Sequence, residues 1–180
     1  MNQQPIDWED FDWNNWTPTE KAVLLFLIVD ENILLIHKKR GLGTGKINGP
    51  GGRLEAGETF SQAALRETLE ETHLRVDDIE EMGELSFVFV DGYSLYAKVF
   101  IARSYSGVPT ETDEAAPFWC PLNQIPWDKM WADDPLWLPL VLKGDYIRAR
   151  FVFDGDTMLT KKVESHPHGA IPVQTNESSD

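Results

Sequence analysis

The sequence predicts an α+β fold built as a single domain. A chain of 180 residues is long enough for one domain with a sizeable core, and 42% of its residues are hydrophobic. Short apolar segments bounded by turn residues outnumber the two segments that carry helix signals. The sequence contains no internal repeat and no linker-like stretch. We therefore expect strands to dominate, with two helices packed against them.

Two strands joined by a turn are predicted at the start of this domain. The segments KAVLLFLIV (21–29) and NILLIHKK (32–39) are apolar runs typical of buried strands. Polar residues at 30–32 lie between them and mark the turn. The next segment, RGLGTGKINGPGG (40–52), holds six glycines and one proline, so we predict a loop there.

Two helices are predicted, one after the glycine-rich loop and one late in the chain. TFSQAALRETLEETHL (59–74) opens with Thr59 and has Gln62 three residues later, which is the pattern of a capping box. Alanine and leucine at the following positions favour a helix. DDPLWLPLVLKG (133–144) has a proline near its start and ends at a glycine, so it predicts the second helix.

The remaining predicted elements are strands. Two hairpins are expected, because apolar segments surround an Asp-Gly pair at 91–92 and another at 154–155. A short apolar strand is expected between these hairpins. The segments concerned are GELSFVFV (83–90), SLYAKVFIARS (94–104), APFWCPL (116–122) and the two halves of 146–163.

The two ends of the chain differ in composition from the predicted domain, which spans residues 21–163. Residues 164–180 are polar, and we predict a flexible tail there. Residues 1–20 form an acidic and aromatic extension, and we expect it to pack in part against the domain. Its large aromatic residues are Trp8, Phe11, Trp13 and Trp16.

Charge and composition exclude several classes of partner. The formal net charge is −14, and an acidic surface repels DNA and anionic membranes, whereas a single small-molecule nucleotide needs only local cations.

The one cysteine, Cys120, cannot form an internal disulfide, which fits a reducing compartment. The opening MNQQPIDWEDFDW lacks the features of a secretory signal, and the apolar run 22–29 is too short to cross a bilayer. We expect a cytoplasmic protein and favour a monomer.

Three carboxylates are crowded into the segment RETLEET (66–72). Glu67, Glu70 and Glu71 share one face of a helix, where each like-charge pair is unfavourable by roughly 0.2–0.5 kcal/mol. A solvated acidic helix face is one interpretation. The glycine-rich loop that precedes the helix favours another, because its backbone can approach a ligand closely. Dense carboxylate oxygens suit Mg²⁺, which would relieve the repulsion and hold a polyphosphate.

The spacing of residues 52–74 resembles the Nudix box, G-x5-E-x7-R-E-U-x-E-E-x-G-U, in which U is aliphatic. Thr68 stands where an aliphatic residue is usual, and its methyl group can still pack. His73 stands where glycine usually closes the helix, and histidine tolerates the left-handed conformation better than most residues. The positions that match are Gly52, Glu58, Arg66, Glu67, Glu70, Glu71 and the aliphatic Leu74.

The resemblance implies a Nudix fold, which is an α/β/α sandwich around a mixed β-sheet with the box forming a loop–helix–loop. It implies that Arg66 pairs with Glu58 and braces the loop. An ordinary helical pair between Arg66 and Glu70 is the alternative, and both contacts are compatible. The implied cofactor is Mg²⁺, with Mn²⁺ as an alternative. Its implied ligands are Glu67, Glu70, Glu71, the backbone carbonyl of Gly51 and a further acid outside the box, for which we favour Glu114.

The resemblance also implies the reaction, which is attack of water on a phosphoanhydride bond. Metal ions neutralise phosphate oxygens and a carboxylate takes a proton from the water. Glu67, Glu71 and Glu114 are alternative candidates for this general base. For a nucleoside triphosphate the family precedent gives the monophosphate and pyrophosphate.

Segments outside the box resemble the Nudix subfamily that hydrolyses oxidised purine nucleoside triphosphates such as 8-oxo-dGTP and 2-hydroxy-dATP. In that subfamily an asparagine contacts the base, a tryptophan stacks on it, and two adjacent aspartates recognise its edge. The corresponding residues are Asn48, Trp131, Asp133 and Asp134. One aromatic residue of strand 83–90 should line the pocket, and we favour Phe87 over Phe89. Leu42 and Val23 replace an aromatic residue and a threonine of the subfamily pattern.

The aspartate pair has a physical interpretation of its own. Two adjacent carboxylates in a pocket cannot easily both ionise, so one pKa rises and the protonated group can donate a hydrogen bond. The alternative is that Asp133 or Asp134 caps the helix that starts near Pro135. Basic residues beside the glycine-rich loop could meet phosphates, or could be ordinary solvated side chains. They are Lys38, which we favour as a substrate ligand, Lys39, Arg40 and Lys46.

Other functions remain open from the sequence. The chain could hydrolyse another nucleoside diphosphate derivative, such as a dinucleoside polyphosphate or a nucleotide sugar. An isoprenoid diphosphate isomerase needs a catalytic cysteine, and Cys120 is predicted to be buried. A Nudix domain that only binds nucleotides would not need all three box glutamates. The segment DWEDFDWNNW (7–16) alone would favour an acidic interaction module.

Overall fold

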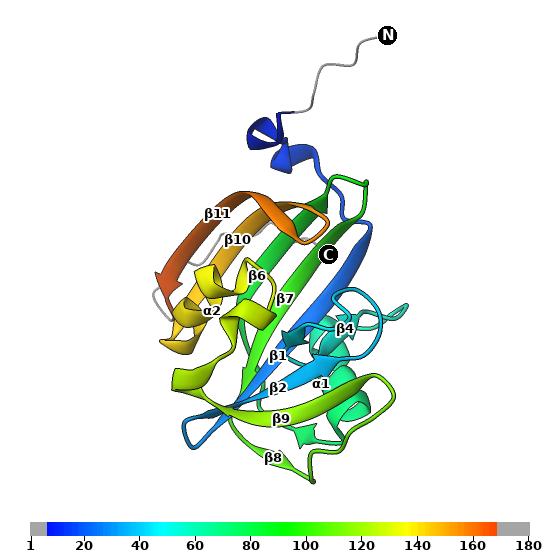
Figure 1. The fold of residues 1–180 in the computed structure, drawn as a ribbon, viewed down its shortest axis with the longest axis vertical. Helices are drawn as coiled ribbons and strands as arrows, with labels where there is room; N and C mark the ends of the chain where they lie inside the picture. Colours follow the sequence, from blue (N-terminus) through cyan, green and yellow to red (C-terminus); the bar gives the residue numbers. More distant parts are fainter. Residues whose placement is uncertain (1–6, 169–180) are drawn as a thin grey trace.

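The computed structural model describes residues 7–168 and contains a mixed sheet (Figure 1). The strands run in the order β11-β10-β6-β7-β1-β2-β3, with β4 paired to β1 and β9 paired to β2. β1 and β7 are parallel, as are β10 and β6, whereas the hairpin neighbours are antiparallel. The strands are β1 (Glu20–Val29), β2 (Asn32–Lys38), β3 (Ile47–Asn48), β4 (Gly51–Arg53), β6 (Glu80–Phe89), β7 (Ser94–Ala102), β9 (Ala115–Pro121), β10 (Asp145–Asp154) and β11 (Thr157–Pro167), and β5 (Arg75–Val76) pairs separately with β8 (Tyr105–Ser106).

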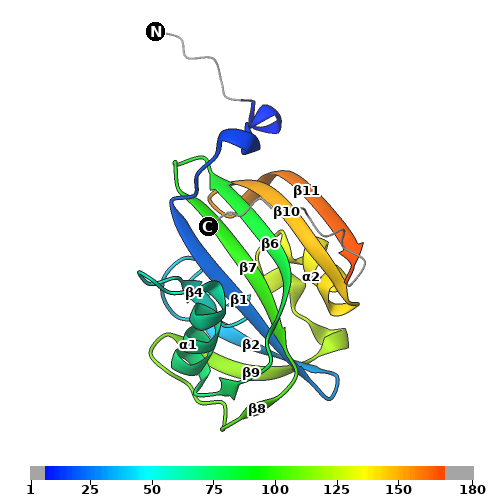
Figure 2. The same ribbon diagram turned by 180° about the vertical axis from the view of Figure 1, so that it is seen from behind.

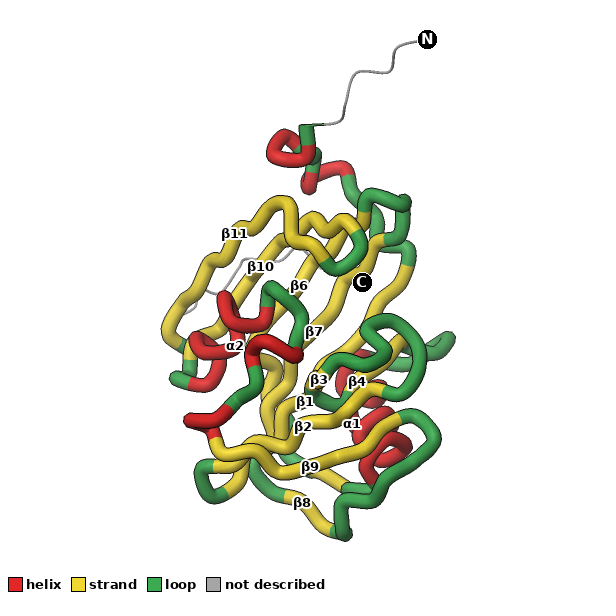
Figure 3. Tube along the Cα trace, in the orientation of Figure 1, coloured by secondary structure: helices red, strands yellow, loops and turns green. Residues whose placement is uncertain are grey.

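The two α-helices of the described region, α1 (Phe60–Thr72) and α2 (Asp134–Leu142), cover opposite faces of the sheet (Figures 2 and 3). Alternation along β1 explains this arrangement, because successive side chains of a strand point to opposite faces. Leu25 packs into the cluster that contains Ala63 of α1, whereas Phe26 packs into the cluster that contains Trp137 of α2. The predicted α/β/α sandwich is therefore confirmed.

Helix α1 begins and ends as the sequence predicts. The Thr59 hydroxyl accepts from the Gln62 backbone N–H at 3.1 Å, and the Gln62 side chain accepts from the Thr59 N–H at 2.9 Å. His73 closes the helix in the left-handed conformation with φ 64°. Thr68 is fully buried, and its hydroxyl donates to the Ala64 carbonyl at 2.8 Å, so this departure from the aliphatic pattern leaves no polar atom unpaired.

Helix α2 starts at Asp134 and carries Pro135 in its first turn, as predicted. Trp137 is fully buried and packs 6.0 Å from Phe26, measured between ring centroids. Short 3-10 turns precede this helix at Leu122–Gln124 and Trp127–Lys129. They lead the chain from β9, beside the carboxylate-rich helix, to the opposite face of the sheet.

Two predicted boundaries are corrected. The glycine-rich segment 40–52 is not all loop, because β3 and the start of β4 lie within it. Gly51 pairs with Leu24 of β1, and a Cβ atom on Gly51 would lie only 2.0 Å from the Val23 carbonyl oxygen. At the other end, residues 164–167 pair with β10 and so belong to β11 rather than to the predicted tail. Residues 169–180 of that tail lie outside the described residues.

The N-terminal extension forms two 3-10 turns, Trp8–Asp10 and Trp13–Asn15, each opened by an aspartate side chain. Its aromatic rings contact one another in sequence order, with centroid separations of 4.8 Å for Phe11 and Trp13 and 5.2 Å for Trp13 and Trp16. The Arg150 guanidinium of β10 stands 5.8 Å from the Trp13 ring centroid, so the extension contacts the domain as expected. No helix within residues 7–168 is long and apolar enough to cross a membrane.

Candidate active site

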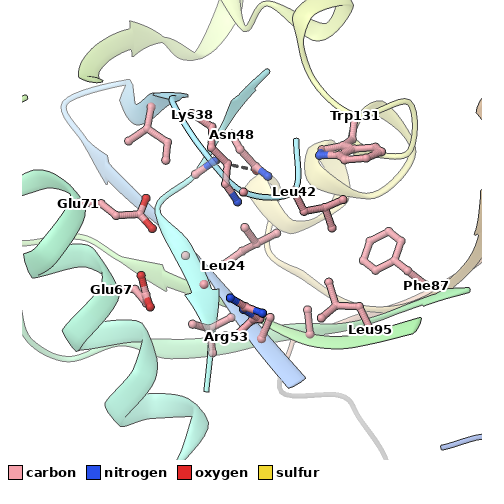
Figure 4. Close-up of a pocket in the computed structure, with 18 of the residues that line it drawn as sticks. Leu24, Lys38, Leu42, Asn48, Arg53, Glu67, Glu71, Phe87, Leu95 and Trp131 are labelled. Atoms are coloured by element: carbon pink, nitrogen blue, oxygen red, sulfur yellow. Dashed lines mark hydrogen bonds between the residues drawn. The ribbon is translucent and has the colours of Figure 1, made fainter. Parts of the chain in front are cut away.

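A cavity of about 820 Å³ joins the predicted carboxylate site on α1 to the predicted base site at the start of α2 (Figure 4). Residues from β1, β2, β4, β6, β7, α1, the glycine-rich loop, the loop before β9 and the segment that leads into α2 line it. They include Val23, Leu24, Lys38, Arg40, Leu42, Asn48, Arg53, Glu67, Glu71, Phe87, Phe89, Leu95, Glu114, Trp131, Asp133 and Asp134.

Three carboxylates converge at one end of this cavity. Glu67 and Glu71 come from α1, and Glu114 comes from the loop before β9, with one oxygen atom of each within 4.8 Å of the others. Glu67 and Glu71 are buried, and Glu114 is half-exposed. Oxygen-only, anionic ligands facing a cavity fit a hard divalent cation such as Mg²⁺ or Mn²⁺.

Burial and mutual repulsion disfavour the ionised forms of Glu67 and Glu71 unless a cation is bound between them. Burial raises the pKa of Glu71 to about 9, and repulsion from Glu67 adds to the rise, while the charge of Lys38 and a backbone hydrogen bond from Gly51 oppose it. Burial also raises the pKa of Glu67, although hydrogen bonding to Arg66 opposes this. A divalent ion between these carboxylates would remove the repulsion and favour the ionised forms.

Arg66 braces the segment between β4 and α1 against the helix, as the resemblance implies. Its guanidinium donates to Glu58 at 2.7 and 2.8 Å, to Glu67 at 2.6 Å and to the Arg53 carbonyl at 3.0 Å. The Glu58 pKa falls to about 2, chiefly because it accepts from Arg66. The structure also contains the alternative pair, since Arg66 donates to Glu70 at 3.2 Å.

Glu70 lies outside the group of converging carboxylates. Its side chain is about half-exposed, at 49%, and turns toward Arg66 rather than toward Glu71 and Glu114. On a helix, residue 70 is one position from residue 71, so the two side chains leave the axis in different directions. Spacing alone did not separate Glu70 from the buried pair Glu67 and Glu71, which are four residues apart.

Gly52 is required by the close approach of the loop to α1. A Cβ atom at this position would lie 2.5 Å from the carboxyl carbon of Glu67 and within 2.7 Å of both its oxygens. Any other residue would displace the carboxylate. The glycine of the box therefore leaves room for Glu67 to face the cavity.

Basic residues of the loop hold the segment that carries Glu114. Arg40 forms an ion pair with Glu114 at 2.9 Å. Lys39 pairs with Glu111 and also donates to the Thr112 carbonyl at 2.9 Å. Lys38 lines the cavity beside Glu71. Of the predicted basic cluster, Lys38 and Arg40 face the cavity, and Lys39 fastens the loop.

The aspartate pair lies at the other end of the cavity and is almost fully buried, with Asp133 1% and Asp134 2% exposed. Asp133 Oδ2 accepts from the Trp137 indole N–H at 2.8 Å. Asp133 Oδ1 and Asp134 Oδ2 have no hydrogen-bond partner among the described residues. Burial raises the pKa of Asp133 to about 6. Burial and then repulsion from Asp133 raise that of Asp134.

The helix-cap alternative for this pair is not what the structure contains. Asp133 occupies the N-cap position of α2, but its backbone is already helical, with φ −78° and ψ −26°, and its side chain makes no capping hydrogen bond. Asp134 is the first residue of the helix itself. Both carboxyl groups face the cavity, with an oxygen of each left for a ligand.

Aromatic rings form the wall between the two ends. Phe87 and Phe89 both line the cavity, so the expectation that only one would do so is wrong. Residues two apart on a strand point to the same face. Trp131 meets Phe89 edge-on at 6.2 Å between centroids, and Asn48 extends from β3 into the same space. Phe87, Trp131 and Asn48 thus all line the one cavity.

Known proteins resemble this chain in sequence. Residues 18–141 match the NUDIX domain family. The chain belongs to the Nudix family. The oxidized purine nucleoside triphosphate hydrolase of Danio rerio is 42% identical over 145 residues, which cover 79% of this chain and 93% of that protein. The protein of the same name from Mus musculus is 41% identical over 139 residues, which cover 76% and 89% of the two chains.

Solved structures confirm the Nudix fold. The mutator MutT protein of Bacillus halodurans superposes with a TM-score of 0.73 at 24% identity, over 81% of this chain and 97% of that one. Glu67, Glu71, the arginine brace and Gly52 are thus parts of a Nudix box, whereas Glu114 lies outside it. Sequence reasoning missed Leu95 and Arg53 of this Nudix cavity. Leu95 pairs with Phe87 in the β6–β7 register, so strand alternation on β7 could have identified it.

Proposed function

We propose that this Nudix protein hydrolyses oxidised purine nucleoside triphosphates, such as 8-oxo-dGTP or 2-hydroxy-dATP, to the monophosphate and pyrophosphate. The observation that supports this proposal most directly is that one cavity joins the converging carboxylates to the buried aspartate pair. The first group suits a phosphate chain with its cation, and the second suits the polar edge of a base. The names of the Danio rerio and Mus musculus relatives agree with this activity.

The carboxylates would hold Mg²⁺, or Mn²⁺ in its place, through Glu67, Glu71 and Glu114, with the Gly51 carbonyl nearby. We retain Glu70 as a ligand only through an intervening water, because its side chain is turned away. When bound, the cation supplies charge neutralisation for the phosphates and lowers the pKa of a coordinated water. Lys38, Arg40 and Arg53 line the same cavity and add positive charge for the phosphate oxygens.

The reaction requires a carboxylate that accepts a proton from the attacking water. Glu67, Glu71 and Glu114 are the candidates, since all three face the cavity within reach of one another. Arg66 holds Glu67 in place through a 2.6 Å hydrogen bond, and the ion pair with Arg40 holds Glu114. Phosphorus is attacked in line, and pyrophosphate leaves.

The base would lie against Trp131 with Phe87 and Phe89 beside it, and with Asn48 at its edge. The buried aspartates would share one proton, because both cannot easily ionise in an apolar site. A protonated carboxyl donates and an ionised one accepts. The pair can therefore match a purine edge that presents both an acceptor and a donor.

The decisive experiment compares initial rates with Mg²⁺ on 8-oxo-dGTP, 2-hydroxy-dATP, dGTP, dATP, a dinucleoside polyphosphate and ADP-ribose. We expect kcat/KM on the oxidised purines to exceed that on the normal ones by at least about tenfold, which corresponds to one unmatched hydrogen bond. Equal rates on dGTP and 8-oxo-dGTP would contradict the proposed preference for oxidised purines. Faster turnover of the dinucleoside polyphosphate or of ADP-ribose would favour another Nudix activity.

We also propose that the protein acts as a cytoplasmic monomer on free nucleotides. The net charge of −14 supports this by disfavouring nucleic-acid polymers and anionic surfaces. Light scattering during size-exclusion chromatography tests the oligomeric state. A dimer at micromolar concentration would contradict the monomer.

A further inference from the structure

Lys46 contacts the aromatic wall of the base site without lining the cavity. It belongs to the glycine-rich loop and immediately precedes β3. Its Nζ atom stands over the Trp131 ring, 5.1 Å from the ring centroid. Trp131 lines the cavity whereas Lys46 does not, so the ammonium group backs the indole from outside the cavity.

The same ammonium group reaches a second part of the chain. Lys46 Nζ lies 3.4 Å from Asp156 Oδ2, in the turn between β10 and β11. The Lys46 backbone is fixed at both ends, since its N–H donates to the Gly43 carbonyl at 2.9 Å and its carbonyl accepts from the Lys38 N–H at 3.0 Å. Lys46 therefore links the glycine-rich loop to the β10–β11 turn, with Trp131 beside the link.

The indole is confined on its other sides as well. A Cβ atom on Gly43 would lie 2.8 Å from Trp131 Nε1, so the loop backbone touches the edge of the ring. Phe89 and Phe153 meet the indole edge-on, at centroid separations of 6.2 and 5.6 Å. Of these contacts, only the one with Lys46 depends on a flexible charged side chain held by an exposed partner.

We propose that Lys46 is a positioning residue for the base: it holds Trp131 in its stacking orientation and, with Asp156, latches the glycine-rich loop to the β10–β11 turn. A cation close to an indole face is attracted by the ring, and more strongly where water is excluded. A ring that is already fixed loses less freedom when a base stacks on it, so the base binds more tightly. The identity of the base rests on the proposed function, whereas the contacts of Lys46 do not.

The charge of Lys46 also acts on the aspartate pair. Burial and repulsion from Asp133 raise the pKa of Asp134, and Lys46 is among the groups that oppose this rise. Lys46 thus acts on both groups that would recognise the base, Trp131 and the aspartates. A merely structural surface lysine would act on neither.

The test measures binding of the product 8-oxo-dGMP by calorimetry in EDTA, so that only the base site and one phosphate contribute. Lys46→Met keeps the length of the side chain and removes its charge, and we expect it to weaken binding about five- to tenfold. Lys46→Arg should restore binding to within about threefold, because guanidinium also stacks on indole. Asp156→Asn should give a smaller loss, since the ammonium remains. On 8-oxo-dGTP, Lys46→Met should raise KM and leave kcat within about twofold.

Lys143→Met is the matched control. Lys143 forms the same kind of exposed pair, with its Nζ 3.4 Å from Asp145 Oδ2, but lines no part of the cavity. We expect it to leave binding and KM unchanged. Wild-type affinity in Lys46→Met, or an equal loss in Lys143→Met, would overturn the inference, and thermal unfolding of each variant identifies any that misfold.

The proposed function and the inference about Lys46 can be contradicted independently of each other. A wild-type chain that binds 8-oxo-dGMP through Lys46 but does not hydrolyse 8-oxo-dGTP would contradict the proposed function alone. A chain that hydrolyses 8-oxo-dGTP but is indifferent to Lys46→Met would contradict the inference alone. Absence of 8-oxo-dGMP binding by the wild-type chain would overturn the inference as well.

Discussion

Two groups of buried carboxyls lie at opposite ends of one cavity, and their surroundings give them different chemistry. At α1, Glu67 and Glu71 are joined by the half-exposed Glu114, beside glycine backbone and basic side chains. At α2, Asp133 and Asp134 are almost fully buried, and the Trp137 indole N–H donates to Asp133. Three converging carboxylates, one of them half-exposed, suit a cation, whereas two enclosed carboxyls cannot easily both ionise.

The difference teaches that carboxyl pairs cannot be interpreted from their proximity alone. Burial raises the pKa in both groups, and repulsion within the pair adds to it in Glu71 and Asp134. What separates the groups is access for a hydrated ion and the presence of a third ligand. The following predictions test this division, beginning with the largest expected effect.

Glu71→Gln should lower kcat/KM on 8-oxo-dGTP by roughly 10³-fold, because it removes an anionic ligand from the centre of the carboxylate group. Steady-state kinetics with saturating Mg²⁺ measure the effect, and circular dichroism confirms the fold. Glu70→Gln is the matched control, and we expect a loss below about tenfold since Glu70 points away. Equal losses in the two variants would show that the division between Glu70 and Glu71 is wrong.

Asp133→Asn should change base preference more than turnover. The substitution replaces the Asp133 carboxyl by an amide, so the pair can no longer exchange a proton. A mismatched hydrogen bond between this amide and the base should alter selectivity by about tenfold or more. The ratio of kcat/KM for 8-oxo-dGTP to that for 2-hydroxy-dATP measures this effect. Glu70→Gln should leave the ratio unchanged. A constant ratio in Asp133→Asn would remove the recognition role from the aspartates.

The stability of the aspartate site should depend on pH with a definite sign. Burial raises the pKa of Asp133 to about 6 in the folded state, so the folded chain binds this proton more tightly than the unfolded chain. The resulting stabilisation is present at low pH and is lost as pH rises through about 6. Asp133→Asn removes this titration and retains an acceptor for Trp137. Its free energy of unfolding relative to the wild type should therefore rise by about 1–3 kcal/mol between acid and neutral pH.

Urea unfolding at several pH values between about 4 and 7.5 measures this difference. Glu71→Gln provides a comparison at the other end of the cavity, measured with Mg²⁺ so that the carboxylate group stays ionised. A stability difference for Asp133→Asn that does not change with pH would indicate that the pKa of Asp133 is the same in the folded and unfolded chains.

The smallest predicted effect concerns the end of α1. His73 adopts φ 64°, a conformation that is unfavourable for residues with a Cβ atom. His73→Gly should stabilise the fold by about 0.5–1 kcal/mol without changing kcat/KM. His73→Ala keeps the Cβ atom and should not stabilise. A similar gain in both variants would assign the effect to loss of the imidazole rather than to the backbone.

The carboxylate site was predictable to the extent that it is local. Thr59, Gln62 and the box glutamates lie within one helix, and helical periodicity fixes their relative directions without knowledge of the rest of the chain. The brace between Arg66 and Glu58 was implied by the resemblance to the Nudix box, not by helical periodicity. Glu70 was the exception, because local spacing does not say which side of the helix meets the sheet.

The base site depended far more on packing between distant segments. The sequence offered helix capping and base recognition as alternatives for Asp133 and Asp134, and only the structure shows that both are buried and that the Asp133 side chain makes no capping hydrogen bond. The pairing of β6 with β7 and β10 brought Leu95 and Phe153 to the wall formed by Phe87 and Phe89. Phe153 lies 64 positions after Phe89 in the sequence, so no local pattern relates the two.

By itself, the sequence determined the family, the two helices, most strand positions and the residues available for chemistry, because these depend on periodicity and spacing over short segments. Only the tertiary structure decided which acids meet, which remain without a partner, and that Lys46 backs Trp131. The physical reason is that side-chain burial and long-range register arise from strand pairing and sheet packing. They also allow contacts between side chains far apart in the sequence, such as Lys46 and Asp156, which are 110 positions apart.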